Sequence, residues 1–263
     1  MRATGVVHRT GLVAAPKPQT VAWGRPAAPL EARRPRLAVR QHFICRSRDH
    51  PFLPMPWAAA GKPTAQPTTH TMAKIPDKQG LFFELDGVLV EQARRDEDGN
   101  IAFLDRAVDA LKQIDPQQFR IFVATSRTDI AFGKYREREF TKFCEAFLER
   151  MNAEQIPITK IYSCPYHPKG KGRFKKESVF RKPGPGIFKM AQQEFDLNLR
   201  RSWMIGHTTS DILAGQRAEL GTILVRTGEG GRDGAFHVDP HFVEDDLWNA
   251  IARVNQFEHA MRV

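Results

Sequence analysis

The stretch LFFELDGVLV, residues 81–90, is an apolar run interrupted by two acidic residues and a glycine. Its first half, LFFEL, predicts a strand buried on both faces of a parallel sheet. Glu84 and Asp86 stand where this strand leaves the sheet, and in open α/β sheets ligands bind at that carboxyl edge. Two carboxylates two residues apart can serve one site, in which one attacks or holds a metal and the other moves a proton.

Strand and helix patterns alternate along the rest of the chain. Further strands are predicted at 119–125, 158–164, 202–206 and 221–228, helices at 104–114, 135–154, 185–195, 210–220 and 243–257, and loops at 91–100 and 229–242. This alternation indicates a parallel sheet with both faces covered. We therefore expect an α/β fold whose central parallel sheet has about five strands flanked by helices.

The charge of the 263-residue chain is uneven. Residues 1–71 hold eleven Lys or Arg and only two acidic residues, so that nearly all of the net charge of +10 lies there. The near-neutral remainder gives no argument for nucleic-acid binding. Three cysteines indicate a reducing compartment, so we expect a cytoplasmic protein. No apolar run reaches the roughly 18 residues that span a bilayer, and no membrane association is expected.

Residues 1–71 are rich in Pro, Ala and Arg without sustained periodicity. Such a composition buries too little apolar surface to offset the entropy of ordering, so we predict disorder. Three interpretations remain: an organelle transit peptide, a basic binding arm, or translated sequence upstream of a start at Met72. We favour the third, because MAKIPDKQG leads directly into the first strand, and we expect one domain over 72–263.

Polar residues that suit phosphoryl transfer stand at the ends of the later strands. This chemistry requires positioning and charge neutralisation. The second strand ends in Thr125 and Ser126, whose hydroxyls can bind a phosphoryl oxygen, although Thr125 alone is equally an ordinary strand-end residue. The loop 169–182 holds seven Lys or Arg against one Glu, which by itself describes a solvated basic loop.

In register, these segments resemble the haloacid-dehalogenase (HAD) phosphohydrolases. FELDG is similar to the family's Asp-x-Asp-Gly-(Thr/Val) signature. TSRTDIAFGKY (125–135) and RKPGPGIF (181–188) are similar to TNQSGIARGY and RKP-x-PGM of subfamily IIIA, which contains the histidinol-phosphate and D,D-heptose 1,7-bisphosphate phosphatases. The resemblance covers about residues 80–228 and implies a Rossmann-like HAD fold.

The resemblance also implies a set of site residues. The catalytic positions are Glu84 and Asp86. The phosphate and substrate positions are Thr125, Ser126, Arg181 and Lys182. The positions for Mg²⁺ are Glu84, Asp86 and Asp211, with His207 as a doubtful fourth.

Two of these positions depart from the family pattern. Glu84 stands where the family has its nucleophilic Asp, and the extra methylene displaces the attacking oxygen by about an ångström, which can cost roughly 10²-fold in rate. His207 stands where the family has an acid, and imidazole is a poor ligand for Mg²⁺. A lone His at a strand end is more often structural.

Two loops bear on metal and substrate. The relatives bind structural zinc through cysteines and a histidine, but here Cys164 and His167 supply at most two of the four ligands, so no zinc is expected. The loop 87–103 is too short for a large inserted domain, so we expect little or no cap and a small to medium substrate.

Three functions follow from the resemblance. The first is a phosphomonoester hydrolase acting with Mg²⁺ on a small phosphorylated metabolite such as heptose bisphosphate or histidinol phosphate, with an activity that the two departures would impair. The second is an inactive HAD-like protein that binds a phosphorylated ligand or a partner. The third is a polynucleotide 3′-phosphatase, against which the near-neutral remainder argues. The sequence leaves the oligomeric state open.

Overall fold

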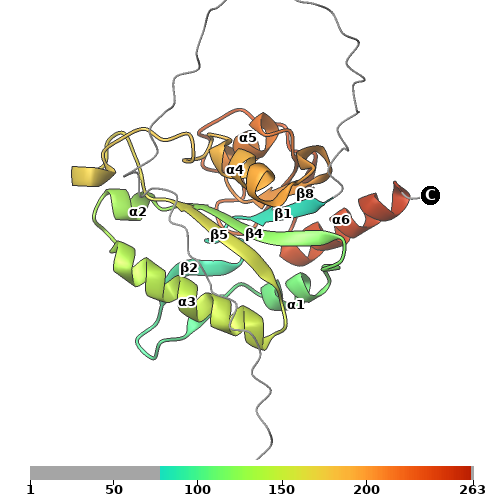
Figure 1. Ribbon diagram of the computed structural model, residues 1–263, viewed down its shortest axis with the longest axis horizontal. Coiled ribbons are helices and arrows are strands. Elements are labelled where there is room, and N and C mark those ends of the chain that lie inside the picture. Colours follow the sequence, from blue (N-terminus) through green and yellow to red (C-terminus); the bar gives the residue numbers. More distant parts are fainter. Residues whose placement is uncertain (1–77, 262–263) are drawn as a thin grey trace, which may run out of the picture. The chain divides into compact units, whose positions relative to one another are not determined.

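The computed structural model describes residues 78–261, so the segment predicted to be disordered lies outside the described residues. The sheet has the strand order β5-β4-β1-β6-β7-β8, and each neighbouring pair is parallel (Figure 1). Its strands are β1 (Gln79–Phe83), β4 (Phe119–Ser126), β5 (Ile158–Cys164), β6 (Trp203–Gly206), β7 (Gly221–Val225) and β8 (Phe242–Glu244). The expected α/β fold is confirmed, with six strands in place of about five.

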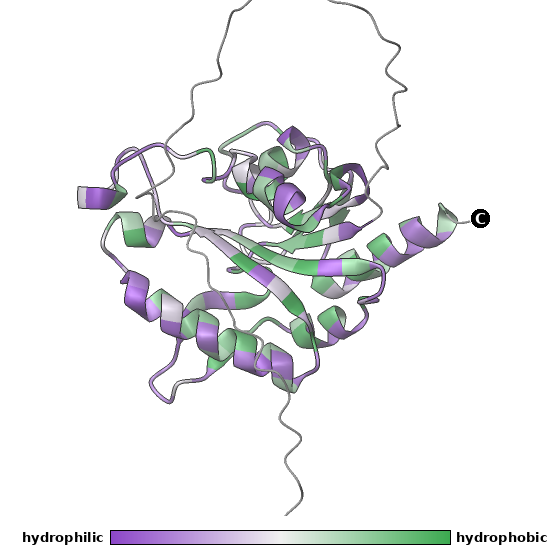
Figure 2. Ribbon diagram, viewed as in Figure 1, coloured by the Kyte–Doolittle hydropathy of each residue, from purple (hydrophilic) through white to green (hydrophobic). Residues whose placement is uncertain are grey.

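Helices cover both faces of this sheet. They are α1 (Ala107–Lys112), α2 (Thr128–Ala131), α3 (Glu137–Ala153), α4 (Gly186–Phe195), α5 (Thr209–Arg217) and α6 (Leu247–Ala260), with single 3₁₀ turns η1 (Gly172–Phe174) and η2 (Leu199–Arg201). Leu81 and Phe83 pack in one core with α1, α3 and α6, whereas Phe82 packs in a second core with α4 and α5. The alternation of β1 side chains between two apolar layers explains why the strand reads as continuously hydrophobic (Figure 2).

The segment after β1 forms a β-hairpin where a loop was predicted at 91–100. Strands β2 (Val90–Arg95) and β3 (Ile101–Phe103) pair antiparallel in a separate two-stranded sheet. In β2 only Val90 and Ala93 are buried, three residues apart, because the register shifts within the hairpin. These residues therefore lack the two-residue alternation that indicates a regular strand. The hairpin is the only element between β1 and α1 in the described chain, consistent with little or no cap.

The C-terminal helix begins four residues later than predicted. Asp246 is its N-cap, with the carboxylate accepting a hydrogen bond of 2.8 Å from the Asn249 amide. The preceding residues Phe242–Glu244, predicted to lie at the end of a loop and the start of the helix, form the edge strand β8 instead. Within residues 78–261, each helix is too short or too polar to cross a bilayer.

Candidate active site

The carboxyl ends of β4, β1 and β6 meet at the centre of one sheet edge, because these three strands are neighbours in the sheet. Thr125 is near the end of β4, Glu84 directly follows β1, and His207 directly follows β6. Topology alone therefore places residues from three distant parts of the sequence at one edge.

Lys182 joins this cluster from the loop between β5 and α4. Its ammonium lies 2.6 Å from Asp211 Oδ1, contacts the Glu84 carboxylate, and donates a hydrogen bond of 2.9 Å to the Ala124 carbonyl. The lysine is 4% exposed, so its charge is almost fully withdrawn from water. Buried charges persist only when paired, and here one cation holds two buried carboxylates.

Glu84 is fixed from two sides. Its Oε1 accepts a hydrogen bond of 2.5 Å from the Thr125 hydroxyl, while its other oxygen contacts Lys182. The predicted nucleophile position is thus buried beside a hydroxyl and an ammonium, the two donors that a phosphoryl group would also need. Ser126, the other predicted hydroxyl, accepts a hydrogen bond of 3.2 Å from the Lys182 amide and so helps to hold the loop that carries the lysine.

Asp211 lies in the first turn of α5. Its Oδ2 accepts hydrogen bonds from the amides of His207 and Thr208, at 3.1 and 3.0 Å. Burial by itself would raise the pKa of Asp211, but the Lys182 ammonium and the Thr208 amide hold the pKa below its ordinary value. Asp211 is therefore a carboxylate at neutral pH and supports the charge of Lys182.

Asp86 points to a different cation. Its Oδ2 lies 2.6 Å from Arg127 Nη1, and its Oδ1 accepts a hydrogen bond from the Ala93 amide of the hairpin. The Asp86 side chain is 36% exposed, whereas that of Arg127 is 3% exposed. Asp86 is thus the more accessible of the two predicted catalytic carboxylates.

Arg127 was not singled out from the sequence. It also forms an ion pair of 2.5 Å with Asp129, and its guanidinium lies 4.8 Å from the centroid of the Phe140 ring. Its Nε is buried with no hydrogen-bond acceptor among the described residues. In the sequence, the only signal for Arg127 is its position directly after Thr125 and Ser126 at the end of a strand. The sequence does not show that the Arg127 side chain turns towards Asp86.

His207 packs between two loops. Its ring lies against Gly87 and Gly228, and its Nδ1 accepts a hydrogen bond of 2.9 Å from the Glu229 amide. Burial lowers the pKa of His207, which agrees with a neutral ring that accepts at Nδ1. In this arrangement the imidazole connects the loop after β7 to the loop after β1.

Arg181 lies away from the Glu84–Lys182 cluster. It lines a separate cavity of about 480 Å³ together with Ser178, Val179 and Arg217. Arg217 donates a hydrogen bond of 3.1 Å to the Pro183 carbonyl, which follows Lys182. Of the predicted site residues, the structure brings together Glu84, Thr125, Lys182 and Asp211. Ser126 and His207 bond to this cluster through the Lys182 amide and the Asp211 carboxylate, whereas Asp86 pairs with Arg127 and Arg181 lines the separate cavity.

The oxygen ligands at this edge suit a hard divalent cation. Between residues 78 and 261 no three His, Cys, Asp or Glu side chains converge as in a closed metal centre. Mg²⁺, however, is commonly held by one or two carboxylates, with phosphate oxygens and water completing its shell. Four carboxylates here, Glu84, Asp86, Asp129 and Asp211, share the two cations Lys182 and Arg127, so the charge balance favours a divalent cation. The site therefore fits Mg²⁺.

Comparison with known proteins identifies the family. The profile of the HAD-hydrolase-like family matches residues 179–250. A D-glycero-beta-D-manno-heptose-1,7-bisphosphate 7-phosphatase of Pasteurella multocida is 30% identical over 154 residues, which cover 58% of this chain and 84% of that protein. The D-glycero-alpha-D-manno-heptose-1,7-bisphosphate 7-phosphatase of Burkholderia mallei is 36% identical over 154 residues, which cover 56% of this chain and 79% of that protein.

A solved structure agrees with these relatives at the level of the fold. The D,D-heptose 1,7-bisphosphate phosphatase of B. bronchiseptica, in complex with magnesium and phosphate, matches with a TM-score of 0.59 and 18% identity over 68% of this chain and 99% of that one. Sequence relatives, fold and strand order together lead to one conclusion. The chain belongs to the HAD-like phosphatases, in the subfamily IIIA branch that contains the heptose bisphosphate phosphatases.

Proposed function

We propose that this protein is a phosphomonoester hydrolase that releases phosphate from a sugar bisphosphate of the heptose 1,7-bisphosphate class. The observation that carries the proposal is the buried contact of Lys182 with both Glu84 and Asp211, beside the Thr125 hydroxyl. A buried ammonium and hydroxyl next to a carboxylate provide charge neutralisation and a positioned attacking oxygen, which are the requirements of phosphoryl transfer. The relatives named above supply the substrate class.

In the proposed reaction Glu84 attacks phosphorus. A Glu84 oxygen forms a bond to phosphorus while the bond from phosphorus to the ester oxygen breaks, and Asp86 donates a proton to the departing oxygen. Water then attacks the phosphorus of the acyl phosphate, Asp86 accepts its proton, and phosphate leaves with Glu84 regenerated. Thr125 and Lys182 hold the phosphoryl oxygens during both steps.

Magnesium enters this proposal as the cation that the charge balance favours. Glu84 and Asp211 would hold it, and it would neutralise charge on the phosphoryl oxygens. His207 is not assigned to the metal, because its Nδ1 already accepts a hydrogen bond from the Glu229 amide. The expected cytoplasmic location remains a proposal that rests on the three cysteines.

A second function is favoured by a specific observation. Both oxygens of Glu84 and both oxygens of Asp86 already have donors in the protein: Thr125 and Lys182 for the first, Arg127 and the Ala93 amide for the second. A site arranged in this way can bind a phosphorylated ligand without turning it over. Catalysis requires that Asp86 exchange one of these contacts for the leaving oxygen.

The two functions are separated by following heptose 1,7-bisphosphate with the full-length protein and Mg²⁺ by ³¹P NMR. For an enzyme we expect loss of the 7-phosphate signal with the 1-phosphate retained, and no loss in Asp86→Asn. If the spectra do not change but the bisphosphate binds saturably in a calorimetric titration, the protein is a binding protein and the proposed enzymatic function is wrong. If histidinol phosphate is hydrolysed with a higher kcat/KM than heptose 1,7-bisphosphate, the proposed reaction stands but the proposed substrate class is wrong.

A further inference from the structure

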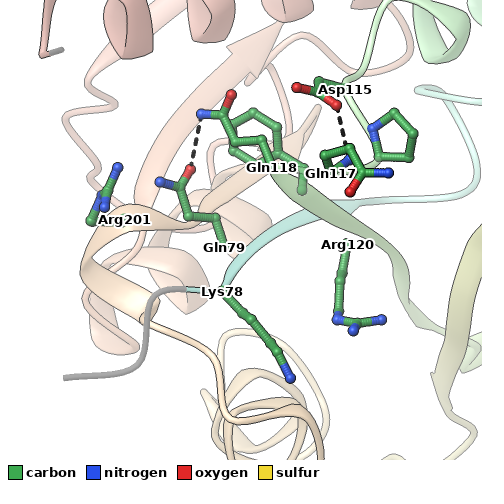
Figure 3. Close-up of a pocket in the computed structure, with 9 residues that line it drawn as sticks. Lys78, Gln79, Asp115, Gln117, Gln118, Arg120 and Arg201 are labelled. Atoms are coloured by element: carbon green, nitrogen blue, oxygen red, sulfur yellow. Dashed lines mark hydrogen bonds between the residues drawn. The ribbon is translucent and has the colours of Figure 1, made fainter. Parts of the chain in front are cut away.

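A second cavity lies at the opposite edge of the sheet. It has a volume of about 560 Å³ and is lined by Lys78, Gln79, residues 115–120 and Arg201 (Figure 3). Gln79 and Phe119 are the first residues of the neighbouring parallel strands β1 and β4. Gln79 and Glu84 are five positions apart along the chain, which corresponds to about 16 Å of extended chain. This cavity is therefore distinct from the candidate active site.

Its charge is predominantly positive. The lining contains three cations, Lys78, Arg120 and Arg201, and one acid, Asp115. The Asp115 carboxylate accepts a hydrogen bond of 2.9 Å from the Gln117 amide and so stabilises the turn before β4. No hydrogen bond or ion pair of the Lys78 or Arg120 side chains is found within residues 78–261, so two like charges line one cavity without an acid of their own.

These two cations face the same side of the sheet. Arg120 pairs in register with Gly80, and side chains two residues apart in a strand point to the same face, so Lys78 is the diagonal neighbour of Arg120. Gly80 places no side chain between them. Figure 3 shows both side chains extending in the same direction from the two strands. An ammonium and a guanidinium group that line one cavity from the same face of the sheet are suited to an anion such as phosphate.

On the opposite face of the sheet, the start of β1 is polar and held by hydrogen bonds to α6, because Gln79 pairs in register with Phe119 (Figure 3). Gln79 and Gln118 donate hydrogen bonds of 3.3 and 3.0 Å to the buried carboxylate of Glu258 on α6, and Arg201 Nη2 lies 3.4 Å from the same carboxylate. Gln118 also donates to the side-chain carbonyl oxygen of Gln79 at 3.5 Å. These hydrogen bonds hold the starts of β1 and β4 together on the face opposite to Lys78 and Arg120.

We infer that this cavity is a second ligand site, which takes the phosphate group of a small molecule. Lys78 and Arg120 bind the phosphate. Because β1 and β4 start at this cavity and end at the candidate active site, a ligand here contacts the same two strands that position Glu84 and Thr125.

The test is a titration of the full-length protein with glucose 6-phosphate, inorganic phosphate and glucose, followed by ¹⁵N-TROSY NMR. We expect shifts of the amides of residues 117–120 with glucose 6-phosphate and with inorganic phosphate, and no shift with glucose. These amides report on the amino edge of the sheet only, so the result does not depend on binding or turnover at Glu84.

Matched variants identify the residues responsible. Lys78→Gln with Arg120→Gln is expected to weaken glucose 6-phosphate binding by about tenfold or more, because two charge-assisted contacts are lost. Arg200→Gln removes one exposed cation next to the cavity and should leave affinity unchanged. If Arg200→Gln weakens glucose 6-phosphate binding as much as the double variant does, the proposed site is wrong. The same holds if potassium chloride at the same ionic strength produces the same amide shifts as glucose 6-phosphate.

Discussion

Lys182 Nζ lies 2.6 Å from Asp211 Oδ1 and contacts the Glu84 carboxylate with the same ammonium group. One buried cation therefore connects the loop before α4 to the end of β1 and to the first turn of α5. This relationship makes Lys182 as important for stability as for the proposed chemistry, since its removal leaves two carboxylates buried without a partner.

Replacement of Lys182 by Met should lower the free energy of unfolding by about 3–5 kcal/mol, the usual cost of an uncompensated buried charge. Urea unfolding at pH 7 measures this change. Lys112→Met is the control, because Lys112 forms a surface ion pair of 2.7 Å with Glu154 and such a pair contributes up to about 1 kcal/mol. Similar losses in the two variants would contradict this role of Lys182.

The dependence of stability on pH in the acidic range should reveal how much the charge of Asp211 stabilises the fold. The Lys182 ammonium holds the pKa of Asp211 below the ordinary value of 3.8, so the stabilisation is complete above that pH and is lost as the pH falls through the lower folded-state pKa. Urea midpoints of wild type and Asp211→Asn should differ most at pH 7 and converge below pH 3.8. A difference that stays constant down to pH 2.5 would show that the Asp211 charge does not contribute.

The packing of His207 between two glycines predicts the effect of a single methyl group. Gly87 has φ +69°, and a Cβ there would lie 2.9 Å from His207 Cε1 and 3.1 Å from Gly228 Cα. Gly133 has a similar φ of +73°, but no atom lies within 4 Å of the position that a Cβ would occupy there. Gly133→Ala should therefore cost about 1–2 kcal/mol for backbone strain alone, and Gly87→Ala about 1–3 kcal/mol more for the collision.

Thermal unfolding of the two glycine variants provides the comparison. The matched φ angles mean that the difference between them reports on the contacts of the added Cβ with His207 and Gly228. Equal destabilisation would show that the His207 ring can move aside at no cost, and the connection between the two loops would then be weak.

The part of the fold that the sequence predicted well is the part with strong periodicity. The β5 prediction at 158–164 matches the strand Ile158–Cys164, and the long helix was expected within a few residues of α3. The hairpin was missed because a register shift leaves Val90 and Ala93 as the only buried residues of β2. The edge strand β8 was missed because three residues carry too little pattern to distinguish them from the helix that follows.

The site was predictable where topology alone brings residues together. Glu84 and Thr125 follow from the rule that parallel strands end at one edge, whereas Asp211 was expected from the family resemblance and lies in the first turn of α5. The direction of the Asp86 side chain did not follow, because it depends on Arg127 and on an amide of the unpredicted hairpin. His207 was named as a doubtful ligand, and its contact with the Glu229 amide depends on the course of a Gly-rich loop that has no sequence pattern.

Arg127 should hold the hairpin through Asp86. Because Arg127 fixes the carboxylate that accepts the Ala93 hydrogen bond, Arg127→Met should accelerate hydrogen exchange of the Ala93 amide by about tenfold. The Asn100 amide is an internal control, since it donates to Asp96 within the same hairpin, at 2.7 Å. Acceleration at both amides would indicate general loosening of the hairpin and contradict a specific role of Arg127.

The central claim is that Glu84 occupies the nucleophile position of a working phosphatase site. The most direct measurement is the initial rate of phosphate release from heptose 1,7-bisphosphate by full-length wild type, Glu84→Asp and Asp86→Asn with Mg²⁺. We expect a measurable wild-type rate and no release above background in Asp86→Asn. In Glu84→Asp we expect a rise of up to about 10²-fold, because the side chain is one methylene shorter and the attacking oxygen returns to the position used by the family. If wild type and Glu84→Asp are both as inactive as Asp86→Asn, the site does not transfer phosphoryl groups and the claim is wrong.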